Sequence, residues 1–174
     1  MSEFVESDLV FVFRDDWKVN RYDEWSFYKT KYQNLCGGQK AIDFLAIDTY
    51  HTLWLIEAKD YRRFPRTKGI ELCEEFALKV THTLSGLVAA KFSPDTPPNE
   101  KTFARDCLNA KRLRVVLHLE QPIKPSKLFP RSHEPTIVRQ KLKQLIKPID
   151  PHPKVTEIAT TNEVDWSVTP KGDN

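Results

Sequence analysis

Three charged side chains interrupt two apolar segments of the sequence, and they are the residues best suited to chemistry. Asp43 lies in the first segment, Lys40–Asp48, and Glu57 and Lys59 close the second, Thr52–Lys59. Charged groups in a buried strand are costly unless they are paired or used, so their presence indicates a site. Because side chains alternate along a strand, Glu57 and Lys59 share one face, which Asp43 can reach from the neighbouring strand.

Two carboxylates a few ångströms apart are typical of a site for a hard cation. Asp43 and Glu57 are therefore the candidate ligands of Mg²⁺, for which Mn²⁺ can substitute, with water and phosphate oxygens completing the coordination. Lys59 is the candidate catalytic residue, because a lysine beside such an ion can position an attacking water. The alternative is a cluster of ion pairs that only ends the hairpin.

The hydrophobic pattern predicts the elements that must position these residues. The two segments are rich in large apolar residues and are separated by a short polar link, which predicts an antiparallel hairpin. Apolar residues at helical spacing predict a helix from Gly69 to Phe92 that packs against it. Further helices are expected over residues 22–33 and Pro135–Lys147, and further strands over Leu9–Phe13, Leu113–Glu120 and Lys154–Thr160. This order predicts an α/β fold with a mixed central sheet flanked by helices.

The hairpin resembles a known family. IDFLAID, which contains Asp43, is followed by LWLIEAKDYR, which contains Glu57 and Lys59. This pair of segments is similar to the core of the PD-(D/E)xK nuclease superfamily, whose signature is an aspartate on one strand and (D/E)xK on the next. The resemblance implies that the whole chain is a single domain with a restriction-endonuclease-like core (αβββαβ) over roughly residues 22–120. A helix and a strand extend this core over residues 134–160.

The resemblance also implies an activity, which is the hydrolysis of phosphodiester bonds at the two carboxylates and the lysine of the hairpin. Many members add an acidic residue from the first helix, for which Glu24 is the better candidate and Asp23 the other. Lys79, on the long helix, is a further candidate for the site. Its alternative is a surface pair with Glu75, four residues earlier.

Charge is unevenly distributed along the chain, which has a net charge of +3. Residues 59–68 carry five basic and one acidic side chains, and residues 111–147 carry ten and two. Such segments attract polyanions, although solvated surface charge is the alternative. The first segment directly follows the candidate site, so four of its side chains are expected to bind phosphates: Arg62, Arg63, Arg66 and Lys68.

These features predict a Mg²⁺-dependent nuclease, a hydrolase of the PD-(D/E)xK type and an endonuclease in the manner of restriction enzymes. Nucleic acid is the expected partner, with DNA preferred, and a homodimer or a larger defence or repair complex would supply specificity. The first alternative is a catalytically silent member of the same fold that binds nucleic acid or serves in assembly. A third hypothesis is a scaffold that uses the amphipathic helix Thr136–Lys147.

A cytoplasmic protein without a membrane partner is expected. The sequence has no apolar run of the length that a membrane span requires, and its first residues lack the pattern of a signal peptide. The three cysteines, Cys36, Cys73 and Cys107, have the spacing of neither a disulfide framework nor a zinc site, which favours a reducing compartment.

Overall fold

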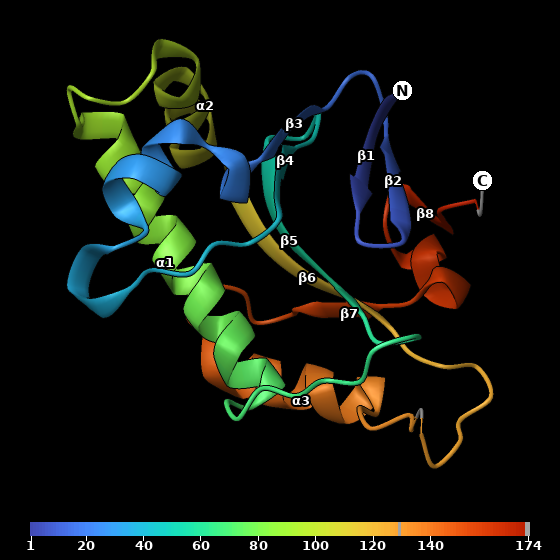
Figure 1. The fold of residues 1–174 in the computed structure, drawn as a ribbon. Helices are drawn as coiled ribbons and strands as arrows, with labels where there is room; N and C mark the ends of the chain where they lie inside the picture. Colours follow the sequence, from blue (N-terminus) through green and yellow to red (C-terminus); the bar gives the residue numbers. More distant parts are fainter. Residues whose placement is uncertain (129, 173–174) are drawn as a thin grey trace.

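The computed structural model describes residues 1–128 and 130–172, and its layers are visible in Figure 1. A five-stranded sheet in the order β3-β4-β5-β6-β7 stands at the centre. Three helices, α1 (Leu72–Phe92), α2 (Pro98–Leu108) and α3 (Pro135–Ile146), lie on one side of it, and a three-stranded sheet in the order β1-β2-β8 lies on the other. The predicted α/β class with a mixed central sheet is confirmed, but helices cover only one face of that sheet, because a second sheet covers the other.

The central sheet combines antiparallel and parallel pairs. Its strands are β3 (Lys18–Arg21), β4 (Phe44–Ile47), β5 (Thr52–Asp60), β6 (Arg112–Glu120) and β7 (Lys154–Thr156). The first three are antiparallel neighbours, whereas β6 is parallel to β5 and β7 is parallel to β6. The pairing of β4 with β5 confirms the predicted hairpin, and its register sets Phe44 opposite Ile56.

Alternation along β5 divides the interior into two cores. Leu53 and Leu55 point to the helices and pack in a core with Phe76 of α1. Trp54 and Ile56 point to the opposite side, where they pack with residues of the second sheet. That sheet consists of β1 (Ser2–Glu6), β2 (Leu9–Phe13) and β8 (Ser167–Pro170). Both faces of β5 are therefore covered, which explains why its segment Leu53–Ile56 is apolar without alternation.

Residues 22–33, expected as one helix, form two short helical turns instead. A 3₁₀ turn spans Tyr22–Glu24, the backbone of Trp25 is extended with ψ of 136°, and a wider π-type turn follows at Tyr28–Tyr32. A contact from outside stabilises the start of the second turn, because the carboxylate of Glu100 on α2 accepts hydrogen bonds at 2.7 and 3.0 Å from two backbone amides that follow Trp25. A partner so distant in sequence leaves no trace in the local pattern.

Several elements lie in stretches that the sequence presents as connections. α2 begins at Pro98, in a stretch rich in proline, because proline at the first helical position lacks only an amide that would have no partner within the helix. β3 is polar, yet it pairs with β4 along its full length. The expected strand Lys154–Thr160 is strand only as far as Thr156, and a 3₁₀ turn at Ile158–Glu163 replaces its second half.

Two further observations bear on the environment of the chain. Within residues 1–128 and 130–172, no helix has both the length and the apolar character that a membrane crossing needs. Cys73 and Cys107 are buried free thiols, and Cys36 is an exposed one.

Candidate functional site

The structure brings together the three residues that the hairpin motif predicted. Asp43 immediately precedes β4, and its Oδ2 accepts a hydrogen bond at 2.7 Å from the backbone N–H of Ala58. Glu57 is fully buried, and its Oε1 contacts the ammonium group of Lys59. Ala58 points to the opposite core, as the alternation predicts. The pairing of β4 with β5 is thus sufficient to place these carboxylates and this lysine together.

Lys79 joins the site from α1. Its Nζ lies 2.5 Å from Oε1 of Glu57 and 3.9 Å from Oδ1 of Asp43. It therefore faces the site and does not form the alternative surface pair with Glu75, which instead contacts other cations. One oxygen of Glu57 thus accepts from two ammonium groups.

Asp23, and not Glu24, is the acidic residue that the first helical turn brings to Asp43. One oxygen each from Glu6, Asp23 and Asp43 lie within 4.8 Å of one another. Glu24 instead approaches Arg21, whose Nε lies 3.1 Å from its carboxylate, and 54% of its side chain is exposed. The preference for Glu24 is therefore corrected. Glu6 was missed because it arrives on β1, a strand that the sequence analysis did not identify.

Negative charge exceeds positive charge in this cluster, which consists of the carboxylates of Glu6, Asp23, Asp43 and Glu57 and the cations of Arg21, Lys59 and Lys79. Burial, together with the charge of Glu57, raises the pKa of Asp43 to about 8. Burial opposes the charge of Lys59, but the Glu57 and Asp43 carboxylates outweigh it and raise the pKa of Lys59. Asp43 is therefore protonated at neutral pH unless a cation balances the cluster.

The residues of this cluster fit a divalent cation. Oε2 of Glu57 and Oδ1 of Asp23 are buried and have no hydrogen-bond partner among the described residues. Carboxylate oxygens are the ligands that Mg²⁺ and Mn²⁺ prefer. One oxygen each of Glu6, Asp23 and Asp43 lies within 4.8 Å of the other two, and Glu57, the other predicted ligand, is not part of this group.

The four basic residues expected to bind phosphates are held within the molecule by ion pairs. Arg62 and Arg63 pair with Asp60 and Asp8, and Arg66 and Lys68 both pair with Glu75. Arg66 and Lys68 differ in exposure, because 56% of the Lys68 side chain is exposed and only 9% of the Arg66 side chain. A phosphate that binds here must share these cations with the carboxylates that already pair with them, and the exposed Lys68 can do so most readily.

A second basic region lies on α3. Val138 and Leu142 bury one side of this helix, which contains no acidic residue. On its other side Arg139 and Lys143, four residues apart, are exposed. Together with His152 and Lys154 they line a cavity of about 450 Å³, and we call these four residues the α3 surface. The sequence signal for this surface was the basic excess of residues 111–147.

The sequence is similar to part of a known ligase. The chain is 33% identical over 165 residues to the cysteine–tRNA ligase of Neisseria meningitidis serogroup A / serotype 4A (strain DSM 15465 / Z2491). The alignment covers 77% of this chain and 23% of the ligase, so the chain spans less than a quarter of the ligase's length. No family model matches the sequence, and no solved structure matches the fold.

This likeness contradicts the function predicted from the hairpin. The relative is a ligase, whereas the motif predicted a Mg²⁺-dependent hydrolase. The predictions of a nuclease, of the hydrolase class and of an endonuclease of the PD-(D/E)xK type are therefore wrong. The motif misled because Glu-x-Lys arises by chance about once in 300 positions. Moreover, a buried cluster of ion pairs at the end of a hairpin places the same residue types together.

Proposed function

We propose that this chain has an aminoacyl-tRNA synthetase-related function, as a tRNA-binding module that serves the joining of cysteine to tRNA. The observation that carries the proposal is the 33% identity with a cysteine–tRNA ligase, which extends over 77% of this chain. Because the chain spans only 23% of that ligase, the proposed role is a part of its work, which is to hold tRNA, and not the complete reaction.

The α3 surface supports this role. Binding to an RNA backbone depends mainly on basic side chains that neutralise phosphates, and it does not require a particular base sequence. Arg139 and Lys143 are exposed one helical turn apart, and Lys154 lines the same cavity. Unlike Arg66 and Lys68, Arg139 and Lys143 form no ion pair with a described residue that would have to be broken first.

Charge reversal on the α3 surface tests the proposal. We expect the double variant Arg139→Glu/Lys143→Glu to bind tRNA at least about tenfold more weakly than the wild type. The slope of log Kd against log salt concentration should fall by about two, because two phosphate contacts are lost. Fluorescence anisotropy with labelled tRNA over a series of salt concentrations measures both quantities.

A matched control variant tests whether the α3 surface itself, or only the net charge of the chain, determines the affinity for tRNA. Lys29→Glu/Lys31→Glu makes the same change of charge on the turn at Tyr28–Tyr32 and should leave tRNA affinity close to that of the wild type. Equal losses in both double variants, or a wild type that does not bind tRNA, would contradict the proposal.

We also propose that the core has a restriction-endonuclease-like arrangement, as the resemblance of the hairpin implies, without the activity of that family. The succession of β3, β4 and β5, then α1, and then the parallel strand β6 supports this arrangement. The cluster at the hairpin would then serve the fold and the binding of a cation.

We propose that this cluster binds Mg²⁺ or Mn²⁺ through Asp43, Asp23 and Glu6, with Glu57 beside them. Its support is the excess of carboxylates and the two buried oxygens without hydrogen-bond partners among the described residues. When bound, the ion would neutralise the cluster and offer a positive charge to a phosphate. Lys79 and Lys59 hold Glu57 in place through its other oxygen.

The response to Mn²⁺ tests this site. A proton on Asp43 competes with the ion, so Mn²⁺ should raise the melting temperature of the wild type by several degrees at pH 8.5 and by less at pH 6. Asp43→Asn should lose this response. The variant should also be more stable than the wild type without metal. Folding raises the pKa of Asp43 from 3.8 to about 8, so the wild type loses stability as pH increases through that range and the carboxyl ionises. Asparagine carries no charge and avoids this loss.

The neighbouring variant Glu24→Gln is the control. Glu24 lies outside the three-carboxylate group and is more than half exposed, so its loss should leave the Mn²⁺ response intact. If Asp43→Asn responded to Mn²⁺ like the wild type, the ion would bind elsewhere and the proposed site would be wrong.

Two expectations from the sequence remain proposals. A cytoplasmic location is supported by the three free cysteines. Assembly into a homodimer or a larger complex remains a prediction of the sequence.

A further inference from the structure

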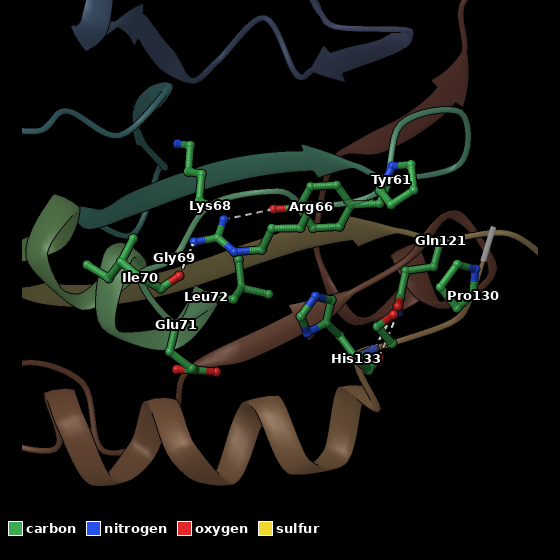
Figure 2. A pocket seen from close by; sticks show the side chains of 12 residues that line it. Tyr61, Arg66, Lys68, Gly69, Ile70, Glu71, Leu72, Gln121, Pro130 and His133 are labelled. Carbon is green, nitrogen blue, oxygen red and sulfur yellow. Dashed lines mark hydrogen bonds between the residues drawn. The ribbon is translucent and has the colours of Figure 1, made fainter. Parts of the chain in front are cut away.

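A cavity of about 420 Å³ lies between the segment that follows β5 and the loop that precedes α3, and Figure 2 shows its lining. Arg66 crosses its wall, where NH1 donates to the hydroxyl of Tyr61 at 3.2 Å and NH2 donates to the carbonyl of Ile70 at 2.6 Å. Leu72, at the start of α1, adds an apolar side chain. The volume is within the range of small-ligand pockets, roughly 300–1,000 Å³.

Two flat rings line this cavity. The ring centroids of Tyr61 and His133 are 5.8 Å apart, with an angle of 42° between the ring planes. Gln121, which is buried, accepts a hydrogen bond at 2.9 Å from the backbone N–H of His133 and donates one at 2.7 Å to its carbonyl. These bonds fix the backbone of His133 and leave its imidazole facing the cavity. Burial and the charge of Arg66 lower the pKa of His133, so the ring is uncharged at neutral pH.

Cations outnumber carboxylates beside the rings. The buried carboxylate of Glu75 lies 2.5 Å from Nζ of Lys68, 2.7 Å from Arg66 and 3.9 Å from Nζ of Lys40. Burial opposes the charge of Glu75, but Lys68 and Arg66 lower its pKa to about 2, so it carries one negative charge. Glu71, the carboxylate that lines the cavity, accepts hydrogen bonds from two backbone amides at the start of α1. A positive surplus remains at the rim, where Lys68 is 56% exposed.

We propose that this cavity binds a nucleotide, with the base against Tyr61 and His133 and the phosphate at Lys68 and Arg66. Stacking on aromatic rings suits any base, and a charged donor beside it suits the phosphate. The guanidinium of Arg66 is held in place before a ligand arrives, which lowers the entropic cost of binding. This site is separate from the α3 surface and does not depend on the proposed role with tRNA.

Calorimetric titration of the full chain with AMP tests the proposal, with adenosine and ribose 5-phosphate as partial ligands. AMP should bind with a Kd below about 1 mM, and each partial ligand should bind at least about tenfold more weakly, because it keeps only part of the contacts. If AMP did not bind at about 5 mM, or if adenosine or ribose 5-phosphate bound as tightly as AMP, the proposal would be overturned.

Two variants assign the contacts. Lys68→Ala should weaken AMP binding about tenfold and leave adenosine binding unchanged, because it removes a contact with the phosphate alone. His133→Ala should weaken both ligands to a similar extent. Lys29→Ala, which changes an exposed lysine in the turn at Tyr28–Tyr32, is the control and should bind like the wild type. Unchanged AMP affinity in both cavity variants, with melting temperatures showing that they fold, would refute the site.

A free nucleotide and the end of an RNA strand offer the same chemistry to this cavity, and a short oligoadenylate distinguishes them. If the oligoadenylate displaces AMP and binds more tightly than AMP does, the ligand is a strand end. If the oligoadenylate binds as tightly as AMP or more weakly, the ligand is a free nucleotide. AMP binding should persist in Arg139→Glu/Lys143→Glu, so that failure of the proposed tRNA surface and failure of this cavity are separate results. Loss of AMP binding in that variant would contradict a separate site.

Discussion

Glu75→Gln is expected to lower the free energy of unfolding by about 2 kcal/mol at pH 7. Glu75 is 2% exposed, and it holds Arg66 and Lys68 against α1. Its removal leaves the nearly buried guanidinium without a counter-charge. We place the loss below the full value that the pKa shift of Glu75 would give, because Lys68 is open to solvent, which screens its share of the interaction.

The pH dependence of this loss gives a second test. The folded state lowers the pKa of Glu75 from 4.5 to about 2, so its stabilising charge is fully present above pH 4.5 and is lost as pH falls towards 2. The stabilities of the wild type and the variant should therefore converge over that range. Urea denaturation between pH 7 and pH 2.5 measures both curves.

Glu74→Gln provides the matched control for Glu75. Glu74 is the neighbouring residue on α1 and is exposed, so the same chemical change should alter stability by less than about 0.5 kcal/mol. Equal losses for both glutamates would mean that burial and ion pairing are not the cause.

Gly86→Ala is expected to destabilise the fold by about 3 kcal/mol. A Cβ at this position in α1 would lie 2.0 Å from the hydroxyl oxygen of Tyr22 and 3.0 Å from a ring carbon of Tyr32. Tyr22 is fully buried, and its ring packs against Trp25 at a centroid distance of 5.1 Å, so it cannot move aside cheaply. Alanine is otherwise favoured over glycine inside a helix by about 1 kcal/mol, so a loss would reverse the intrinsic preference.

A second substitution identifies the clash. The hydroxyl of Tyr22 is buried and has no hydrogen-bond partner among the described residues, so Tyr22→Phe alone should cost little. In the double variant with Gly86→Ala, it should restore at least about half of the lost stability, as measured in a thermodynamic cycle by guanidinium denaturation.

Gly69→Ala is the control for the clash, because no atom lies within 4 Å of a Cβ there and the backbone requires no left-handed conformation. If the stability losses of Tyr22→Phe and Gly86→Ala simply added in the double variant, the hydroxyl of Tyr22 would not be the cause of the clash.

Local patterns predicted those parts of the fold that depend on local interactions. The apolar periodicity of the long helix gave α1 to within a few residues, and the two adjoining apolar segments gave the β4–β5 hairpin. The same alternation placed Glu57 and Lys59 on one face and Trp54 on the other. Asp43 was within reach because a short link joins the two strands.

Contacts between distant segments could not be predicted in this way. Glu6 reaches the carboxylate cluster on β1, which pairs with β2, and Glu100 stabilises the start of the second helical turn from across the fold. The choice between Asp23 and Glu24 depended on the exact geometry of a single 3₁₀ turn, which the sequence pattern does not specify. The function was mispredicted because carboxylates and a lysine at the end of a hairpin do not by themselves specify a reaction.

The pairing of β8 with β2 has a consequence for the way in which the molecule opens. It sets Val168 beside Phe11, so residues from nearly opposite ends of the chain occupy one small sheet. Contacts of such long sequence separation form slowly, because a large loop must close before they are made. Once formed, they let neither end fray without exposing the core that contains Trp54 and Trp166. Amide hydrogens of β2 should accordingly exchange only when this sheet and that core open together.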